Sequence, residues 1–142
     1  MSLPEALSLR WLMTAHVRLI RDFGSGIGVR DVGLLESALN RPLTSFEDQP
    51  LYRTPFQRAG ILWIGLIRNH GFVDGNKRTA TAAMARWLLA EGYRLKSGQN
   101  ELVDMAVAIA NRDHELDDVS RWLEAHVESP PGAAKPSARR SR

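Results

Sequence analysis

Residues 70–81 read His-Gly-Phe-Val-Asp-Gly-Asn-Lys-Arg-Thr-Ala-Thr, and this stretch decides how the chain on either side of it is interpreted. Its first nine residues contain an imidazole, a carboxylate, a turn glycine, an amide and two cations, set between two strongly apolar segments. Charged and hydrogen-bonding groups are costly to place among buried elements unless they have partners. The sequence therefore predicts a polar functional site in a loop that joins two core helices.

The loop leads directly into a helix. Asp74-Gly75 is a strong turn dipeptide, because glycine tolerates positive φ and the aspartate side chain can bond its own backbone. Asn76 is a good candidate for the N-cap of the helix that follows. The next apolar residues keep helical spacing, and Gly92 ends the pattern as a residue just beyond a helix does; they are Ala80, Ala83, Met84, Trp87 and Leu88.

Lys77 and Arg78 fall in the first turn of this helix, where cations oppose the helix dipole. That placement is explained if an anion is held there by free backbone N–H groups, with the two cations around it. His70 adds a candidate general base, and Asp74 adds a candidate ligand for a hard cation. Each of these residues alone is more often a cap, a turn or a solvated surface residue. Their combination, in this order and spacing, favours a site for a triphosphate with its magnesium ion.

The rest of the chain reads as helices joined by short loops, so we expect an all-α bundle of about six helices. The helix opened by the capping-box pattern Thr54-Pro55-Phe56-Gln57 is apolar nearly all round, which predicts the central buried helix. Residues 43–53 show no strong period and are expected to form a surface loop. The other predicted helices are a stripe over residues 12–23, a short helix capped by Asp31 and stopped by Pro42, and two helices over residues 102–110 and 119–127.

Composition limits the classes of protein that fit. Of 19 basic residues four follow residue 128, so residues 1–128 carry 15 basic against 16 acidic residues, which argues against a nucleic-acid-binding domain. We expect one helical domain over residues 1–128 and a disordered Pro/Arg-rich tail over 129–142. The absence of cysteine excludes thiol catalysis. No apolar run approaches a membrane span, and the start does not resemble a signal peptide, so we expect a cytoplasmic protein with no membrane partner.

Other sites fit the sequence less well. The four histidines are scattered without a His-x-x-x-His pair, which disfavours a zinc site. His16 lies on an apolar stripe and is expected to be a core histidine whose hydrogen-bonding groups are satisfied. The Gly-rich segment 24–28 lacks the Gly-Lys-Ser/Thr ending of a phosphate-binding loop.

The pattern His-x-Phe-x-Asp-Gly-Asn-Lys-Arg resembles the signature of the Fic/Doc superfamily, in the form found in its Doc (death-on-curing) branch. Fic enzymes carry His-x-Phe-x-Asp/Glu-Gly-Asn-Gly-Arg-x-x-Arg. Lys77 stands where the Fic pattern has its second glycine, and Thr81 stands where it has its second arginine. Residues 23–39 are similar to the Doc-type segment before the second helix, so that the resemblance covers most of residues 5–127.

The resemblance implies roles for the loop residues. His70 would take the proton from an acceptor hydroxyl as that hydroxyl attacks a nucleotide phosphate. Asp74 would hold Mg²⁺, while Gly75, Asn76, Lys77 and Arg78 would cradle the phosphates of ATP. Phe72 would pack into the core and fix the loop.

The resemblance also implies a reaction and leaves alternatives. With lysine at position 77, Doc-type proteins bind the nucleotide so that its γ-phosphate faces the histidine, and the family reaction is phosphorylation of a threonine of elongation factor Tu, which blocks translation. The expected function is therefore a Doc-like toxin with protein kinase activity. A Fic-type AMP-transferase and a non-catalytic binding module remain as alternatives.

Regulation follows from a missing segment. Many Fic proteins carry an inhibitory helix reading Ser/Thr-x-x-x-Glu-Gly/Asn, and the nearest match here, over residues 97–102, ends Glu-Leu. The resemblance therefore implies an external Phd-like antitoxin. We expect it to bind an exposed apolar groove near the N-terminal helix and the loop.

Overall fold

The computed structural model describes residues 7–21 and 26–128, and these are mostly helical. The elements are α1 (Leu9–Arg21), α2 (Val32–Asn40), the 3₁₀ helix η1 (Arg41–Leu43), β1 (Ser45–Phe46), β2 (Gln49–Pro50), α3 (Pro55–Asn69), α4 (Asn76–Ala90), β3 (Arg94–Leu95), α5 (Gln99–Ala110), α6 (Leu116–Ala125) and β4 (Val127–Glu128). The prediction of an all-α bundle of six helices is confirmed, with two short two-stranded pairs added to it.

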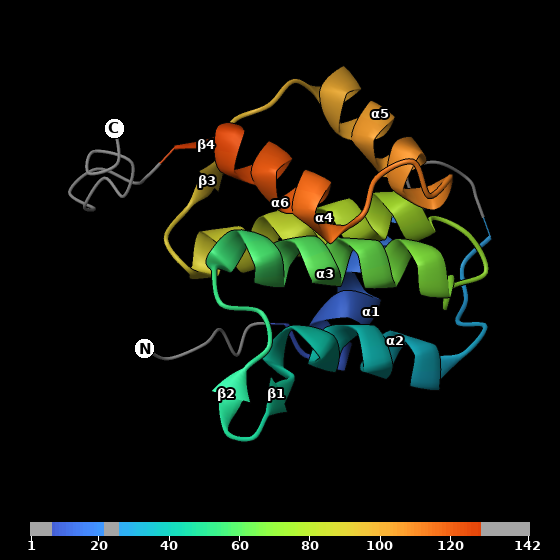
Figure 1. The fold of residues 1–142 in the computed structure, drawn as a ribbon. Coiled ribbons are helices and arrows are strands. Elements are labelled where there is room, and N and C mark those ends of the chain that lie inside the picture. Colours follow the sequence, from blue (N-terminus) through green and yellow to red (C-terminus); the bar gives the residue numbers. More distant parts are fainter. Residues whose placement is uncertain (1–6, 22–25, 129–142) are drawn as a thin grey trace.

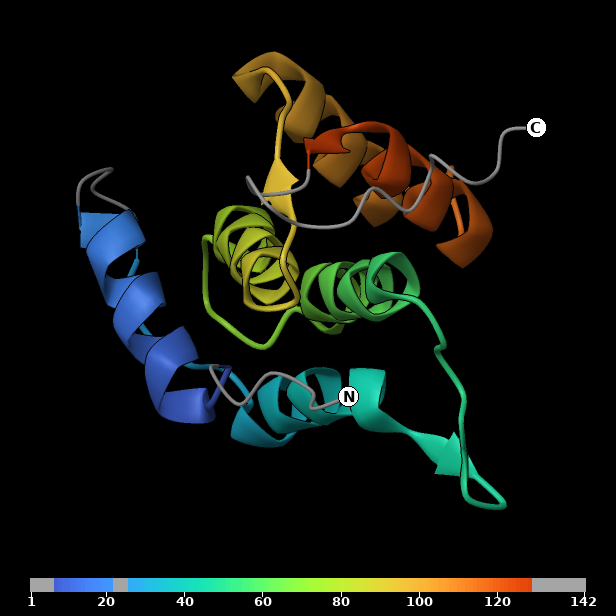
Figure 2. The same ribbon diagram turned by 90° about the vertical axis from the view of Figure 1, so that its left-hand side faces the viewer.

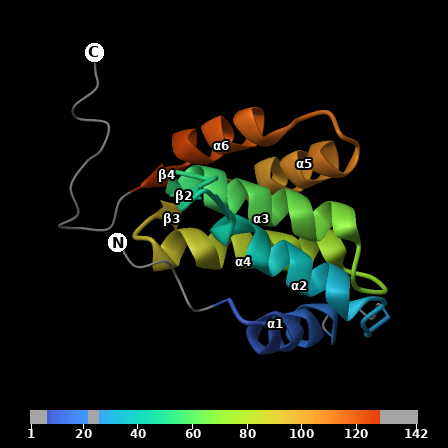
Figure 3. The same ribbon diagram turned by 60° about the horizontal axis from the view of Figure 1, so that its bottom comes forward.

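The helices form three layers (Figure 1). α3 and α4 lie side by side in the middle layer, α1 and α2 cover one side of it, and α5 and α6 cover the other. The view along the central pair in Figure 2 and the tilted view in Figure 3 show the same order of layers. The loop between α3 and α4 lies at one end of the central layer, so the two best-packed helices of the fold hold it from both sides.

Local signals explain where the helices begin and end. The Asp31 side chain accepts a hydrogen bond from the Leu34 N–H and caps α2. The predicted capping box at the start of α3 is confirmed, because Thr54 accepts from the Gln57 N–H at 3.0 Å while the Gln57 side chain accepts from the Thr54 N–H at 3.2 Å. Gly92, two residues after α4, has φ +96°, as expected for a residue that turns the chain out of a helix.

The core centres on α3, as predicted. Its residues from Phe56 to Ile67 are buried except for the half-buried Gln57. Because α3 packs against α2, α4, α5 and α6, it has no face left for solvent over most of its length. The largest fully buried side chains around it include Trp63, Trp87 and Phe72.

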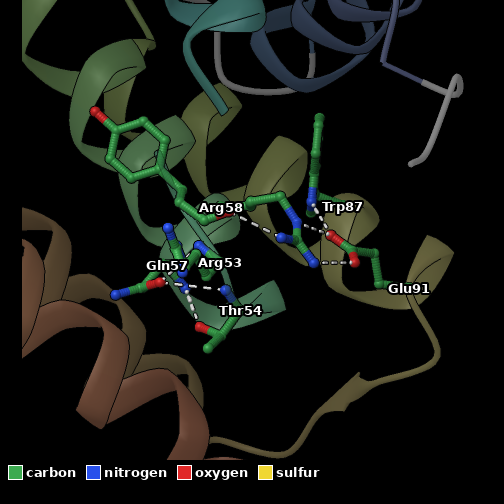
Figure 4. A network of polar contacts seen from close by, with 7 residues as sticks. Arg53, Thr54, Gln57, Arg58, Trp87 and Glu91 are labelled. Atoms are coloured by element: carbon green, nitrogen blue, oxygen red, sulfur yellow. Dashed lines mark hydrogen bonds and ion pairs between the residues drawn. The ribbon is translucent and has the colours of Figure 1, made fainter. Parts of the chain in front are cut away.

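One buried ion pair joins the start of α3 to the end of α4 (Figure 4). Arg58 donates to both carboxylate oxygens of Glu91, at 2.9 and 2.8 Å, and to the Tyr52 carbonyl at 2.9 Å. The Trp87 indole N–H also donates to Glu91, at 2.7 Å. With side-chain exposures of 6% and 3%, both charges are removed from water, and the network fixes the relative position of α3 and α4.

Some expectations need correction or lie outside the described residues. Residues 43–53 are not a plain loop, because β1 and β2 form a hairpin there whose turn residues Glu47 and Asp48 both have positive φ. β3 and β4 also pair, tying the end of α6 to the segment after α4.

The predicted tail, residues 129–142, lies outside the described part of the chain. Within residues 7–21 and 26–128, none of the helices has the length and apolar character that a membrane crossing requires.

Candidate active site

The loop over residues 70–75 begins and ends on left-handed backbone. His70 follows the last residue of α3 with φ 53° and ψ 49°, and Gly75 precedes α4 with φ 75° and ψ 19°. A glycine is required at position 75 for a second reason, because a Cβ there would overlap the buried Ile20 side chain of α1. The chain therefore turns sharply out of α3, leaves the His70 side chain exposed, and turns again into α4.

Asn76 closes this turn from inside. It is the first residue of α4 rather than its N-cap, which corrects the sequence-based prediction and gives the cap to Gly75. Its side-chain oxygen accepts from the Phe72 N–H at 2.9 Å, and its side-chain nitrogen donates to the Phe72 carbonyl at 3.0 Å. Asn76 is 6% exposed, so this pair of hydrogen bonds to one backbone residue is shielded from water and shapes the loop.

The same amide reaches the ring of His70. The Asn76 side-chain nitrogen lies 3.2 Å from Nδ1 of His70. The two bonds to Phe72 fix which end of the amide is nitrogen, and an amide nitrogen can only donate. Nδ1 is therefore the acceptor while this bond is made, and the neutral ring carries its proton on Nε2.

The N-terminus of α4 has the features of an anion site. Its N-cap makes no side-chain hydrogen bond, so the first N–H groups of the helix are not capped by a side chain. Lys77 and Arg78 in the first turn are exposed, and both lie within two residues of the buried Asn76. Backbone donors and two cations are thus grouped where the dipole of α4 also favours negative charge.

Asp74 is the residue of this loop that could ligate a cation. Its carboxylate is exposed, and one oxygen accepts from the Gly75 N–H at 2.7 Å. Among the described residues no group of three His, Asp or Glu side chains is placed to hold a metal ion. One carboxylate suits Mg²⁺ that takes its other ligands from phosphates and water, and does not suit a metal held by protein alone.

Thr81, at the position of the second Fic arginine, points into the helix pair. Its hydroxyl accepts from the Trp63 indole N–H at 3.0 Å and donates to the Lys77 carbonyl at 2.8 Å. Both hydrogen-bonding roles of this hydroxyl are thereby used inside the protein. Position 81 supports the backbone of Lys77 and adds no cation to the start of α4.

Beneath the loop lies a histidine that the sequence marked only as a core residue. His16 of α1 is 2% exposed, stacks on the Phe72 ring with centroids 3.8 Å apart, and pairs through Nδ1 with the Thr79 hydroxyl at 3.1 Å. In the described part of the structure, its Nε2 is buried without a hydrogen-bond partner, so the prediction of a core histidine is confirmed but the prediction that its hydrogen-bonding groups are satisfied is wrong for this atom. Burial lowers the pKa of His16, and the nearby charge of Asp74 opposes that shift only in part. His16 is therefore neutral near pH 7 and supports the loop through Phe72 and Thr79.

The loop is also bonded to the segment before α2. Val73 donates to the Gly28 carbonyl at 3.0 Å, and the backbone N–H groups of Arg30 and Asp31 both donate to the Gly71 carbonyl, at 2.7 and 3.0 Å. Sequence reasoning used this segment for the family resemblance and did not place it against the loop. The site thus gathers four parts of the chain: α1, the segment before α2, the loop itself and the first turn of α4.

A cleft lies apart from the polar groups of the loop. It has a volume of about 500 Å³, lies between η1, α3 and the start of α6, and includes Arg41, Arg68, Arg112 and Tyr52 in its lining. Arg68 is held there by Glu115 and by the carbonyls of Ile109 and His114, which makes it a structural tie. The loop, where the polar groups converge, is therefore the candidate active site.

Comparisons with known proteins identify the family of the chain. Residues 6–88, which include the whole loop and most of α4, match the model of the Fic/DOC family. The chain is 37% identical over 103 residues to "Toxin Doc" of Mycolicibacterium smegmatis (strain ATCC 700084 / mc(2)155). That similarity covers 71% of this chain and 79% of the relative.

Proposed function

The chain belongs to the Fic/DOC family, and from this we propose that it is a Doc-like toxin of a toxin–antitoxin module. In this proposal it is a protein kinase that transfers the γ-phosphoryl group of ATP to a threonine of elongation factor Tu and so blocks translation. The proposal is supported above all by one observation. A single tight loop presents His70 and Asp74 beside a helix N-terminus that bears two cations and no side-chain cap.

Each residue of the loop would have its own role. The first-turn N–H groups of α4, with Lys77 and Arg78, bind and orient the phosphates, and positioning with charge stabilisation supplies most of the catalysis in phosphoryl transfer. Asp74 holds Mg²⁺, which neutralises phosphate charge when bound. His70 accepts the proton of the threonine hydroxyl, a role worth about 10²- to 10⁴-fold in rate.

Asn76 places a condition on that proton transfer. In the observed arrangement Nδ1 of His70 accepts from Asn76, so the neutral ring has its proton on Nε2. The ring becomes a base at Nε2 when the hydrogen bond from Asn76 is given up and the proton moves to Nδ1. We propose that substrate binding brings this change about, which keeps the free enzyme from acting on water.

Transfer of phosphate rather than AMP is supported by positions 77 and 81. Lys77 adds bulk and charge where Fic enzymes have a bare backbone for a diphosphate. The Thr81 hydroxyl is bonded to Trp63 and to the Lys77 carbonyl, so it cannot replace the missing arginine. Both features act against the nucleotide orientation that would place an α-phosphate beside His70.

An antitoxin partner is part of the proposal. Exposed apolar side chains occur on α1, in the segment before α2, on α2 and in the catalytic loop itself: Val17, Ile27, Val32 and Val73. Positions 26 and 28 lie against the Val73 side chain, so these two loops adjoin. We propose that a helix of a Phd-like antitoxin covers these residues by burying its own apolar face.

A labelling experiment tests the transfer against all the proteins of a bacterial cell at once. Bacterial lysate is incubated with the protein and Mg²⁺, and with ATP labelled either at the γ-phosphate or at the α-phosphate. We expect one protein to gain label from γ-labelled ATP alone, and expect the His70→Ala variant to give none. Label from α-labelled ATP would replace the kinase proposal with AMP transfer, and no label from either would leave a binding module.

A further inference from the structure

Arg30 of the segment before α2 makes contacts that the motif-based site does not include. Its guanidinium donates from Nε to the His70 carbonyl at 2.9 Å, and from Nη2 to the carbonyls of His70 and of Asn69, the latter at 3.2 Å. Arg30 lies forty residues before His70 in the sequence, and the two are brought together only by the fold. Three donor contacts therefore converge on the two carbonyls that end α3.

These carbonyls have a particular need for donors. The last carbonyls of a helix have no partner within the helix, and a planar guanidinium can satisfy two of them at once. His70 also has φ 53°, a backbone conformation that a residue with a side chain rarely adopts. Such a conformation persists only where neighbouring groups hold it. Arg30 binds the carbonyl on each side of the backbone turn at His70, which places it where it can hold that conformation.

The backbone around Arg30 strengthens this restraint. The N–H groups of Arg30 and Asp31 both donate to the Gly71 carbonyl, and Val29 pairs with Phe72 in an isolated antiparallel bridge. The guanidinium therefore approaches His70 from a segment that is itself fixed to the loop. The imidazole itself is held by Asn76, whose side-chain nitrogen lies 3.2 Å from Nδ1.

The contacts of Arg30 are placed for orientation rather than for stability. Arg30 is exposed, and so is His70, so water can replace the guanidinium at these carbonyls without leaving a buried group unsatisfied. The buried pair of Arg58 and Glu91 is the opposite case, because neither charge can be hydrated in place. Loss of Arg30 should thus leave the core folded and release the His70 backbone from its turn.

We infer that Arg30 is a positioning residue for His70, an inference that rests on the proposed function because it assigns the proton transfer to that histidine. Arg30 fixes the backbone turn from which the imidazole projects, and so sets where the ring lies, both beside Asn76 before the reaction and after substrate binding releases that bond. A displacement of about 1 Å at a catalytic group costs about 10²-fold in rate. A side chain of the segment before α2 thereby joins the machinery of the loop.

The test compares Arg30→Ala and Arg30→Lys with the unaltered protein. The control is Arg86→Ala, an exposed arginine on α4 that lies ten residues, or about 15 Å along the helix, from Asn76. The first readout is the nitrogen NMR spectrum of the histidine rings. The signals of His70 are those that disappear in a His70→Ala sample. This readout needs no substrate, so it decides the role of Arg30 even where the proposed kinase activity fails.

In the unaltered protein, at a pH where the His70 ring is neutral, we expect Nδ1 to be unprotonated and Nε2 to carry the proton. In Arg30→Ala the two ring nitrogens should move toward the average of the two tautomers, while His16, His114 and His126 keep their signals. Arg30→Lys should be intermediate, because an ammonium reaches one carbonyl more readily than two. Arg86→Ala should match the unaltered protein, and the Tm of every variant should stay within about 3 °C.

The second readout is kinetic. With γ-labelled ATP, we expect Arg30→Ala to lower kcat about 10- to 100-fold while the KM for ATP changes less than about twofold, since Arg30 does not contact the proposed phosphate site. Unchanged His70 signals in Arg30→Ala would overturn the inference. A general loss of stability that shifts all the histidine signals would also overturn it, because the role would then be structural.

Discussion

Replacing Gly75 by alanine tests whether the catalytic loop depends on close approach to α1. Gly75 has φ +75°, and a Cβ built there would overlap the Cδ1 methyl of Ile20 and lie 2.9 Å from its Cγ1. Ile20 is fully buried, so its side chain cannot swing into solvent to make room. The alanine must therefore strain its own backbone and push either α1 or the loop away.

The expected loss follows from these two costs. A positive φ costs a residue with a side chain roughly 1–2 kcal/mol relative to glycine. Adding a methyl group to a filled core costs about 1–3 kcal/mol more. We expect Gly75→Ala to lower the free energy of unfolding by about 2–5 kcal/mol, which is a large part of the stability of a typical domain.

A double-mutant cycle separates overlap from backbone strain. Ile20→Val alone should cost about 0.5–1.5 kcal/mol, because it removes one buried methyl group. It also removes Cδ1, the nearer of the two Ile20 atoms that the new Cβ would meet, so the double variant should be at least about 1 kcal/mol more stable than the two losses predict by addition. Urea unfolding of all four proteins measures the coupling. Losses that add to within about 0.5 kcal/mol would refute the proposed contact between Gly75 and α1.

Three further predictions concern other parts of the molecule. Arg58→Met leaves the carboxylate of Glu91 buried without its cationic partner, so we expect the free energy of unfolding, measured with urea, to fall by about 3–5 kcal/mol. Combining Arg58→Met with Glu91→Leu should recover part of that loss, and equal losses in the single and double variants would contradict this expectation. The pKa of His16 is lowered in the folded state, whereas in the unfolded state it returns to its ordinary value of 6.5. The unfolded state therefore binds more protons as the pH drops below 6.5, and the free energy of unfolding should fall over that range. His16→Gln should weaken this pH dependence, and an unchanged slope between about pH 7 and pH 5 would show that another group causes it. Lys77→Gly restores the bare backbone of the Fic pattern, so label from α-labelled ATP should appear on the target protein. If this variant transfers label only from γ-labelled ATP, Lys77 does not determine which phosphate is transferred.

Much of the fold was predictable because its helix ends are encoded locally. Asp31 and the Thr54–Gln57 capping box each use side chains within three residues of a helix start, and both predictions are confirmed. The nearly continuous apolar run of α3 likewise identifies a helix that neighbours cover on every side. Such signals do not depend on contacts with distant parts of the chain.

The strands could not be predicted in the same way. The turn of the β1–β2 hairpin is formed by Glu47 and Asp48, which both have positive φ. It lacks the glycine or asparagine from which such a turn is usually predicted. β3 and β4 have two residues each and pair across more than thirty positions, so neither shows a periodic pattern. Two-residue strands are set by tertiary contacts rather than by local sequence.

The site shows the same division. Residues 70–78 were identified from their order and spacing, and their chemical roles stay predictions. Two of the groups that support them were not identified, because His16 reaches Phe72 and Arg30 reaches His70 only through the packing of α1 and of the segment before α2. A histidine on an apolar helical stripe and an arginine beside a helix cap are common features, and the sequence alone gives no sign that they meet one loop.

Intact mass measurement of purified elongation factor Tu, after incubation with this protein, ATP and Mg²⁺, tests the central claim most directly. We predict a mass increase of one phosphate on a single threonine, abolished in a parallel sample by His70→Ala. An increase of the size of AMP, or no change in mass while the His70→Ala and unaltered proteins behave alike, would contradict the account.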